Sequence, residues 1–90
     1  MTNKNLKELA KAIVAIKDPV IAEEFLQNIL TPKELDEVAK RLQIFKLLYK
    51  GIPQRKIAEE LNVSIGTIGH GSRELQYGKK AIQKILAKGW

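Results

Sequence analysis

Apolar residues recur along this chain at steps of three and four, the spacing that places them on one face of a helix. A first helix is predicted roughly from Asn5 to Ile16. A second helix is predicted to begin at Asp18-Pro19, because aspartate accepts free amides at a helix start and proline suits the first turn. No segment shows the strict apolar-polar alternation of a strand. The pattern therefore predicts an all-α protein.

The clearest helix start is the sequence TPKE, in which Thr31 fits the N-cap position and Glu34 completes a capping box. This central helix is predicted to run to about Lys50 and to stop at Gly51. Its last turns are apolar on most sides, so they need cover on most sides. A chain of 90 residues buries only a modest share of its surface. We therefore expect a second copy of the chain to cover this helix, in a homodimer.

Residues 54 to 76, QRKIAEELNVSIGTIGHGSRELQ, have the pattern of a helix-turn-helix, a motif whose second helix enters the major groove of DNA. A short helix from Gln54 to Leu61 is followed by a turn at Asn62, a residue that tolerates positive φ, and by an N-cap at Ser64. The side chains predicted to face inward are Ile57, Ala58 and Leu61 on the first helix, and Ile65, Ile68 and Leu75 on the second.

The second of these helices contains three glycines, Gly66, Gly69 and Gly71. Each glycine in a helix is roughly 0.8–1 kcal/mol less favourable than alanine. Two explanations are open. The glycines let the backbone approach its neighbours or DNA closely, or a bound ligand or DNA orders a helix that is weakly formed alone.

The charge supports a partner that carries phosphate. The formal net charge is +6, and from Lys50 onward eight basic residues face only three acidic ones. An excess of basic residues in one region indicates a phosphate-facing surface. The alternative is a solvated lysine-rich face.

Composition excludes several classes of function. The chain has no cysteine and one histidine, which excludes disulfides, zinc fingers, thiol catalysis and a multi-histidine metal site. No nucleophile-base constellation can be assembled, so no enzyme is expected. The amino-terminal residues lack the apolar run of a signal peptide, and no stretch is as long and apolar as a membrane span. We therefore expect a cytoplasmic protein without a membrane partner, a metal or a tightly bound cofactor.

The order of these elements resembles the tryptophan repressor family. The resemblance rests on LTPKE at residues 30–34, Arg41 in the central helix, Gly51 at its end, QRKI at 54–57 and IGTIGHGS at 65–72. SRELQYG at 72–78 is also similar to a Trp-repressor-like branch of the family. The resemblance implies a single domain over residues 1–90, in an intertwined six-helix homodimer with a helix-turn-helix head that reads double-stranded DNA. It also implies L-tryptophan, a small aromatic amino acid, as the corepressor between the central helix and the reading helix.

The resemblance further implies a ligand site. Leu30 and Thr31 match positions that line the pocket and cap the ligand's amino group, Arg41 matches an arginine that packs on the indole, and Gly71 matches a pocket glycine. At three further positions the residues differ from the family pattern. His70 replaces the arginine that pairs with the ligand carboxylate, Glu74 replaces a serine near the ligand amine, and Phe45 replaces a smaller valine.

Each of these replacements changes the chemistry of the predicted site. A histidine can donate one hydrogen bond to a carboxylate, without the bidentate fork of an arginine. Glu74 can attract an ammonium group, and Phe45 fills more of the pocket. His70 is equally well interpreted as an exposed side chain that touches a DNA phosphate.

The resemblance also assigns DNA contacts. Gln54 and Arg55 match contacts at the start of the first motif helix, and Ile65, Gly66, Thr67 and Gly69 match the tip of the reading helix. Further predicted contacts are His70, Arg73 and Gln76.

The predicted function is a sequence-specific DNA-binding transcriptional repressor with L-tryptophan as corepressor. One alternative is a related DNA-binding regulator with a different small ligand or none. Another is a helical protein-interaction module whose basic face meets an acidic partner. Because phosphate binding weakens steeply with salt, the salt dependence of binding to duplex DNA separates the protein-interaction module from the two DNA-binding alternatives.

Overall fold

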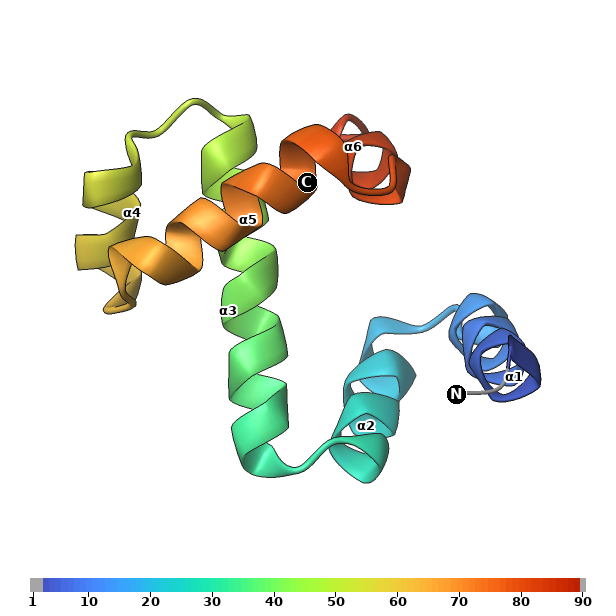
Figure 1. The fold of residues 1–90 in the computed structure, drawn as a ribbon. Coiled ribbons are helices and arrows are strands. Elements are labelled where there is room, and N and C mark those ends of the chain that lie inside the picture. Colours follow the sequence, from blue (N-terminus) through green and yellow to red (C-terminus); the bar gives the residue numbers. More distant parts are fainter. Residues whose placement is uncertain (1–2, 90) are drawn as a thin grey trace. The chain divides into compact units, whose positions relative to one another are not determined.

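The computed structural model describes residues 3–89, which form six α-helices and no strands (Figure 1). The all-α prediction is therefore confirmed. Trp90, interpreted from the sequence as either a loose tail or a staple onto a partner chain, lies outside the described residues. The helices are α1 (Asn3–Ala15), α2 (Pro19–Ile29), α3 (Pro32–Tyr49), α4 (Gln54–Leu61), α5 (Ile65–Tyr77) and α6 (Ala81–Leu86).

The chain divides into two compact units, with the boundary between Leu35 and Asp36. The first unit holds α1, α2 and the first turn of α3, and the second holds the rest of α3 with α4, α5 and α6. That residues 1–90 form a single domain stays a prediction. Across residues 3–89, every helix is too short or too polar to span a membrane.

The helix starts expected from the sequence are confirmed by hydrogen bonds. The backbone amide of Thr31 donates to Glu34 Oε1 at 2.9 Å, and the Glu34 amide donates to Thr31 Oγ1 at 3.2 Å, which is a complete capping box. Asp18 accepts the amide two residues further on at 2.9 Å. Ser64 Oγ accepts the Thr67 amide at 3.1 Å at the start of α5. Local side-chain chemistry therefore sets where these helices begin.

The ends of α3 and α4 are also set by residues close by in the sequence. Gly51, with φ of +83°, follows α3, and Asn62, with φ of 54° and ψ of 51°, ends α4 in the left-handed conformation. Asparagine adopts this region more readily than most residues. The Val63 amide then donates to the Ala58 carbonyl at 3.1 Å. Three residues therefore suffice to turn the chain from α4 into α5.

The core of the second unit is built from one isoleucine on each of three helices. Ile44 of α3 is 3% exposed, and Ile57 of α4 and Ile68 of α5 are fully buried. Figure 1 shows α5 crossing the carboxyl-terminal half of α3. Half-buried apolar residues pack around this centre: Leu47, Leu48, Ile52, Ala58, Leu61 and Val63.

The expectation that Ile65 faces inward is wrong, because its side chain is 52% exposed. Ile65 is the first residue of α5. At 3.6 residues per turn it lies roughly 60° around the helix from Ile68. It therefore falls outside the strip of α5 that packs on the core.

The first unit buries little of its apolar surface within the chain. Neither α1 nor α2 contains a buried residue. Their spacing is nevertheless that of helices with one apolar face. The large apolar side chains left exposed on these helices are Leu6, Leu9, Ile13, Val14, Val20, Ile21, Leu26 and Ile29.

Candidate functional site

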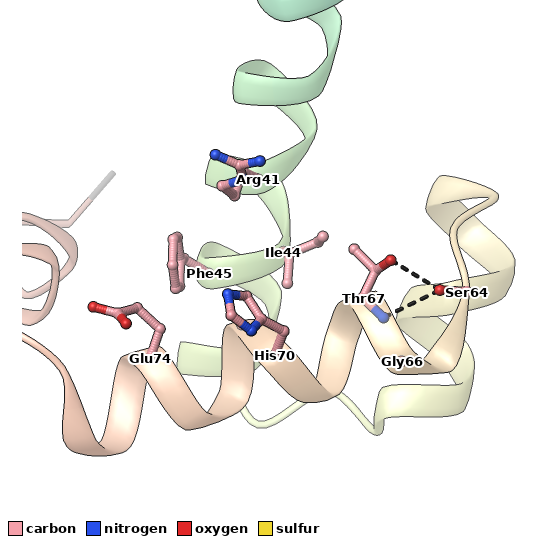
Figure 2. A pocket seen from close by; sticks show the side chains of 9 residues that line it. Arg41, Ile44, Phe45, Ser64, Gly66, Thr67, His70 and Glu74 are labelled. Carbon is pink, nitrogen blue, oxygen red and sulfur yellow. Dashed lines mark hydrogen bonds between the residues drawn. The ribbon is translucent and has the colours of Figure 1, made fainter.

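A cavity of about 670 Å³ lies between the second half of α3 and α5 (Figure 2). All of its lining residues belong to the second unit. Both walls come from helices that share the isoleucine core, so the core holds the walls in place. The α3 wall consists of Arg41, Ile44 and Phe45, and the opposite wall of Ser64, Gly66, Thr67, His70, Gly71 and Glu74.

Helical spacing explains which side chains meet here. Arg41 and Phe45 are one turn apart on α3, and His70 and Glu74 are one turn apart on α5, so each pair shares a helix face. In Figure 2, the His70 side chain rises from α5 toward α3, whereas the Glu74 carboxylate extends along α5 toward its carboxyl-terminal end, where it lies beside Gly78. The ring of Phe45 and the side chains of His70 and Glu74 therefore line the same cavity from opposite walls.

Gly71 allows the two walls to approach each other. A Cβ atom at this position would lie 3.0 Å from Ile44 Cγ2 and 3.7 Å from Leu48 Cδ1. At Gly66 and Gly69 an added Cβ would meet no atom closer than 3.7 Å. Close packing against a neighbour thus explains the glycine at 71, whereas the other two glycines have room for a side chain.

The polar groups of the cavity are accessible and carry both signs of charge. Arg41, His70 and Glu74 are exposed, and Phe45 is half-buried. Within residues 3–89 none of these polar side chains forms an ion pair. A guanidinium and a carboxylate in one cavity complement a ligand that itself carries a carboxylate and an ammonium group.

The structure brings together five of the seven residues predicted for the ligand site: Arg41, Phe45, His70, Gly71 and Glu74. Their role as ligand contacts stays a prediction. Leu30 and Thr31 belong to the first unit, so their assignment also stays a prediction.

Four lining residues were missed as pocket residues. Ile44 was interpreted only as part of an apolar helix end, and Ser64 only as an N-cap, while Gly66 and Thr67 were assigned to DNA. Thr67 precedes His70 by three residues and so shares its helix face. That spacing is the signal that could have found it.

Residues 4–89 match the family described as Trp repressor protein. The chain belongs to the Trp repressor family. The resemblance seen in the sequence is therefore confirmed, and it covers nearly all of the described residues.

Individual relatives within the Trp repressor family match to different extents. A protein of Bacillus subtilis, named Uncharacterized protein YerC, is 30% identical over 86 residues, which cover 96% of this chain and 83% of that protein. The Trp operon repressor homolog of Actinobacillus succinogenes is 49% identical over 55 residues, 60% of this chain and 54% of that protein. The homolog of Pasteurella multocida is 47% identical over 55 residues, with the same coverage. The chain thus matches about half the length of these repressor homologs. No solved structure matches the chain.

Five of the residues predicted to contact DNA lie at the starts of two helices, and the others, Gly69, His70, Arg73 and Gln76, lie further along α5. Gln54 and Arg55 open α4, and both are exposed. At the start of α5, Ile65, Gly66 and Thr67 are exposed as well. Gly66, Thr67 and His70 also line the cavity. One face of α5 therefore adjoins both the predicted DNA surface and the cavity.

Proposed function

We propose that this Trp repressor family member is a sequence-specific DNA-binding transcriptional repressor, in which α4 and α5 form the helix-turn-helix. The observation that carries the proposal is the left-handed turn at Asn62, which joins two helices that share the core through Ile57 and Ile68. This arrangement leaves the first three residues of both helices exposed. A reading helix contacts base edges with its amino-terminal residues.

The proposed repressor acts as a homodimer. The apolar side chains that α1 and α2 leave exposed are the support for this part of the proposal. A soluble monomer rarely exposes large contiguous apolar patches. A symmetric partner would bury these stripes and would present two reading helices to successive half-sites on the DNA.

The proposed corepressor is a small aromatic amino acid, with L-tryptophan as the first candidate. The cavity between α3 and α5 supports this proposal, because it combines the Phe45 ring with charged groups of both signs. Since α5 carries one wall, a ligand in the cavity is placed to bias the orientation of the reading helix.

DNA binding is tested by titrating the chain with a labelled mixed-sequence duplex at several salt concentrations. We expect affinity to fall steeply with salt, by about 0.9 in log-log slope for each phosphate contact. Arg55→Gln, at the exposed start of α4, is expected to weaken binding about ten-fold, the value of one charged hydrogen bond. Lys17→Gln, between α1 and α2, is the control and should bind as the parent chain does. Polyglutamate binding as tight as duplex binding would instead favour the protein-interaction module.

Ligand binding is tested by calorimetric titration of the chain with L-tryptophan. We expect one saturable site per chain, and tighter binding by the His70→Arg variant, because arginine offers a bidentate fork to a carboxylate. Glu59→Gln, on α4 and outside the cavity lining, is the control. Unchanged or weaker tryptophan binding by His70→Arg would contradict the assignment of His70 to the ligand carboxylate.

A second candidate keeps the DNA binding and replaces tryptophan with another ligand or none. The observation that favours it is the chemistry of the lining, where Glu74 adds a carboxylate and Phe45 a bulky ring to the cavity. The same titration separates the two candidates. No heat from tryptophan at two temperatures, with duplex binding intact, would select the second.

A further inference from the structure

The last turn of α5 has carbonyl groups that the helix itself cannot satisfy. The final carbonyls of an α-helix have no amide of a following turn from which to accept a hydrogen bond. The Gly78 amide still donates to the Glu74 carbonyl at 2.8 Å. Among residues 3–89, no backbone amide beyond α5 donates to the carbonyls of Leu75 and Gln76. These two carbonyls therefore depend on side-chain donors.

Both donors come from the segment that follows α5. Gln83 Nε2, on α6, donates to the Leu75 carbonyl at 2.5 Å. Lys80 Nζ, from the N-cap residue of α6, donates to the Gln76 carbonyl at 3.1 Å. Figure 1 shows α6 following directly on the carboxyl-terminal end of α5. Side chains that hydrogen-bond the last carbonyls stabilise a helix end. The proposed reading helix is therefore capped at this end from α6.

The packing of α6 holds Gln83 in place. Gln83 and Leu86 lie three positions apart and so share one face of α6. Leu86 is 6% exposed, and Gln83 is half-buried. Leu86 lines a small cavity together with Lys46 and Tyr49 of α3, which places α6 against the end of α3. A polar side chain on a face that packs inward needs a hydrogen-bond partner, and the Leu75 carbonyl supplies it.

The second half of α5 depends on this cap because the core does not extend to it. The buried residues of α5, Ile68 and Gly71, both lie in its first half. From Ser72 to Tyr77 every residue is half-buried or exposed. The three glycines also lower the helix propensity of α5. Loss of the cap should therefore unravel the last turn of α5 before the rest of the unit opens.

We propose that Gln83 is a positioning residue for DNA binding, because its bond to Leu75 keeps the second half of the reading helix formed in the free protein. The proposal rests on the proposed DNA-binding function and gives α6 a part in it. A helix that is partly unravelled must be ordered when DNA binds, and the apparent affinity falls with the fraction of competent molecules. Gln83 acts through α5, without a contact to DNA of its own.

The experiment measures amide hydrogen exchange of the full chain without DNA, and its binding to a 30-base-pair duplex of mixed sequence by fluorescence anisotropy. Exchange at residues 75–78 reports opening of the last turn of α5. Exchange at residues 44–48, in the part of α3 that contains the buried Ile44, is the internal reference for opening of the whole unit.

The variants separate the hydrogen bond from the packing of α6. Gln83→Met removes the donor and has a side chain of nearly the same length. Gln83→Arg keeps a donor and tests for rescue of slow exchange. Ala81→Met, at an exposed position of the same helix, is the matched control. Circular dichroism checks that each variant keeps its helices.

We expect Gln83→Met to speed exchange at residues 75–78 about five-fold, the value of one hydrogen bond, and to leave exchange at residues 44–48 unchanged. Duplex binding should weaken by about two- to five-fold, because fewer molecules carry a fully formed α5. Gln83→Arg should restore slow exchange, and Ala81→Met should match the parent chain in both measurements.

Two results would overturn the proposal while leaving the repressor proposal standing. One is exchange at residues 75–78 that rises in Gln83→Met no more than exchange at residues 44–48 does. The other is faster exchange at residues 75–78 together with duplex binding equal to that of the parent chain. A parent chain that does not bind the duplex would overturn both proposals.

Discussion

Replacing Ile68 with alanine is expected to lower the free energy of unfolding by about 2–5 kcal/mol. Ile68 is fully buried between Ile44 of α3 and Ile57 of α4, so truncation removes apolar contacts and leaves a cavity at the meeting point of three helices. Total stabilities of small domains are only about 5–15 kcal/mol, so the loss is a large share of what holds the unit together.

Ile65 provides a matched control on the same helix. Its side chain is 52% exposed, and we expect Ile65→Ala to change the free energy of unfolding by less than about 0.5 kcal/mol, as at other surface positions. Urea unfolding followed by circular dichroism measures both variants, at one protein concentration because a dimer's apparent stability depends on concentration. Equal losses for the two variants would contradict the isoleucine core described for this unit.

Replacing Gly71 with leucine is expected to lower the free energy of unfolding by about 3 kcal/mol. Its Cβ would already lie 3.0 Å from the Cγ2 atom of Ile44, a side chain that is 3% exposed and packs in the isoleucine core. The remaining leucine atoms would push α5 away from α3 and reshape the cavity between them. Leucine favours helices far more than glycine does, so the loss cannot be attributed to helix propensity.

A substitution at Gly66 is expected to raise the free energy of unfolding instead. An added Cβ there would meet only Ser64 Oγ, at 3.8 Å, so Gly66→Ala gains helix propensity without a clash. We expect a gain of roughly 0.8–1 kcal/mol in the free energy of unfolding. The same urea titration measures both glycine variants. A stabilising Gly71→Leu would show that α3 and α5 are not in the close contact described.

Much of the fold could be predicted from the sequence because the deciding interactions are local. The Thr31–Glu34 capping box, the Ser64 N-cap and the left-handed Asn62 each depend on residues within four positions of one another. Such interactions form in the same way wherever the helix later packs.

The cavity could be predicted only through family resemblance. Arg41 and Glu74 are far apart in sequence, and no spacing rule places them in one cavity. The inward assignment of Ile65 failed for a related reason. Periodicity marks an apolar face, but it does not show how wide a strip of that face the neighbouring helices cover.

The glycines of α5 show most clearly which features follow from the sequence and which follow from packing. Three glycines and a helix cap are visible in the sequence of α5, and they predict a weak helix with a well-defined start. The packing of α5 on α3 shows that Gly71 is needed because Ile44 lies so close, while Gly66 and Gly69 have room for a Cβ atom. The physical reason is that helix propensity and capping are properties of neighbouring residues, whereas steric fit depends on which distant helix is placed against each position.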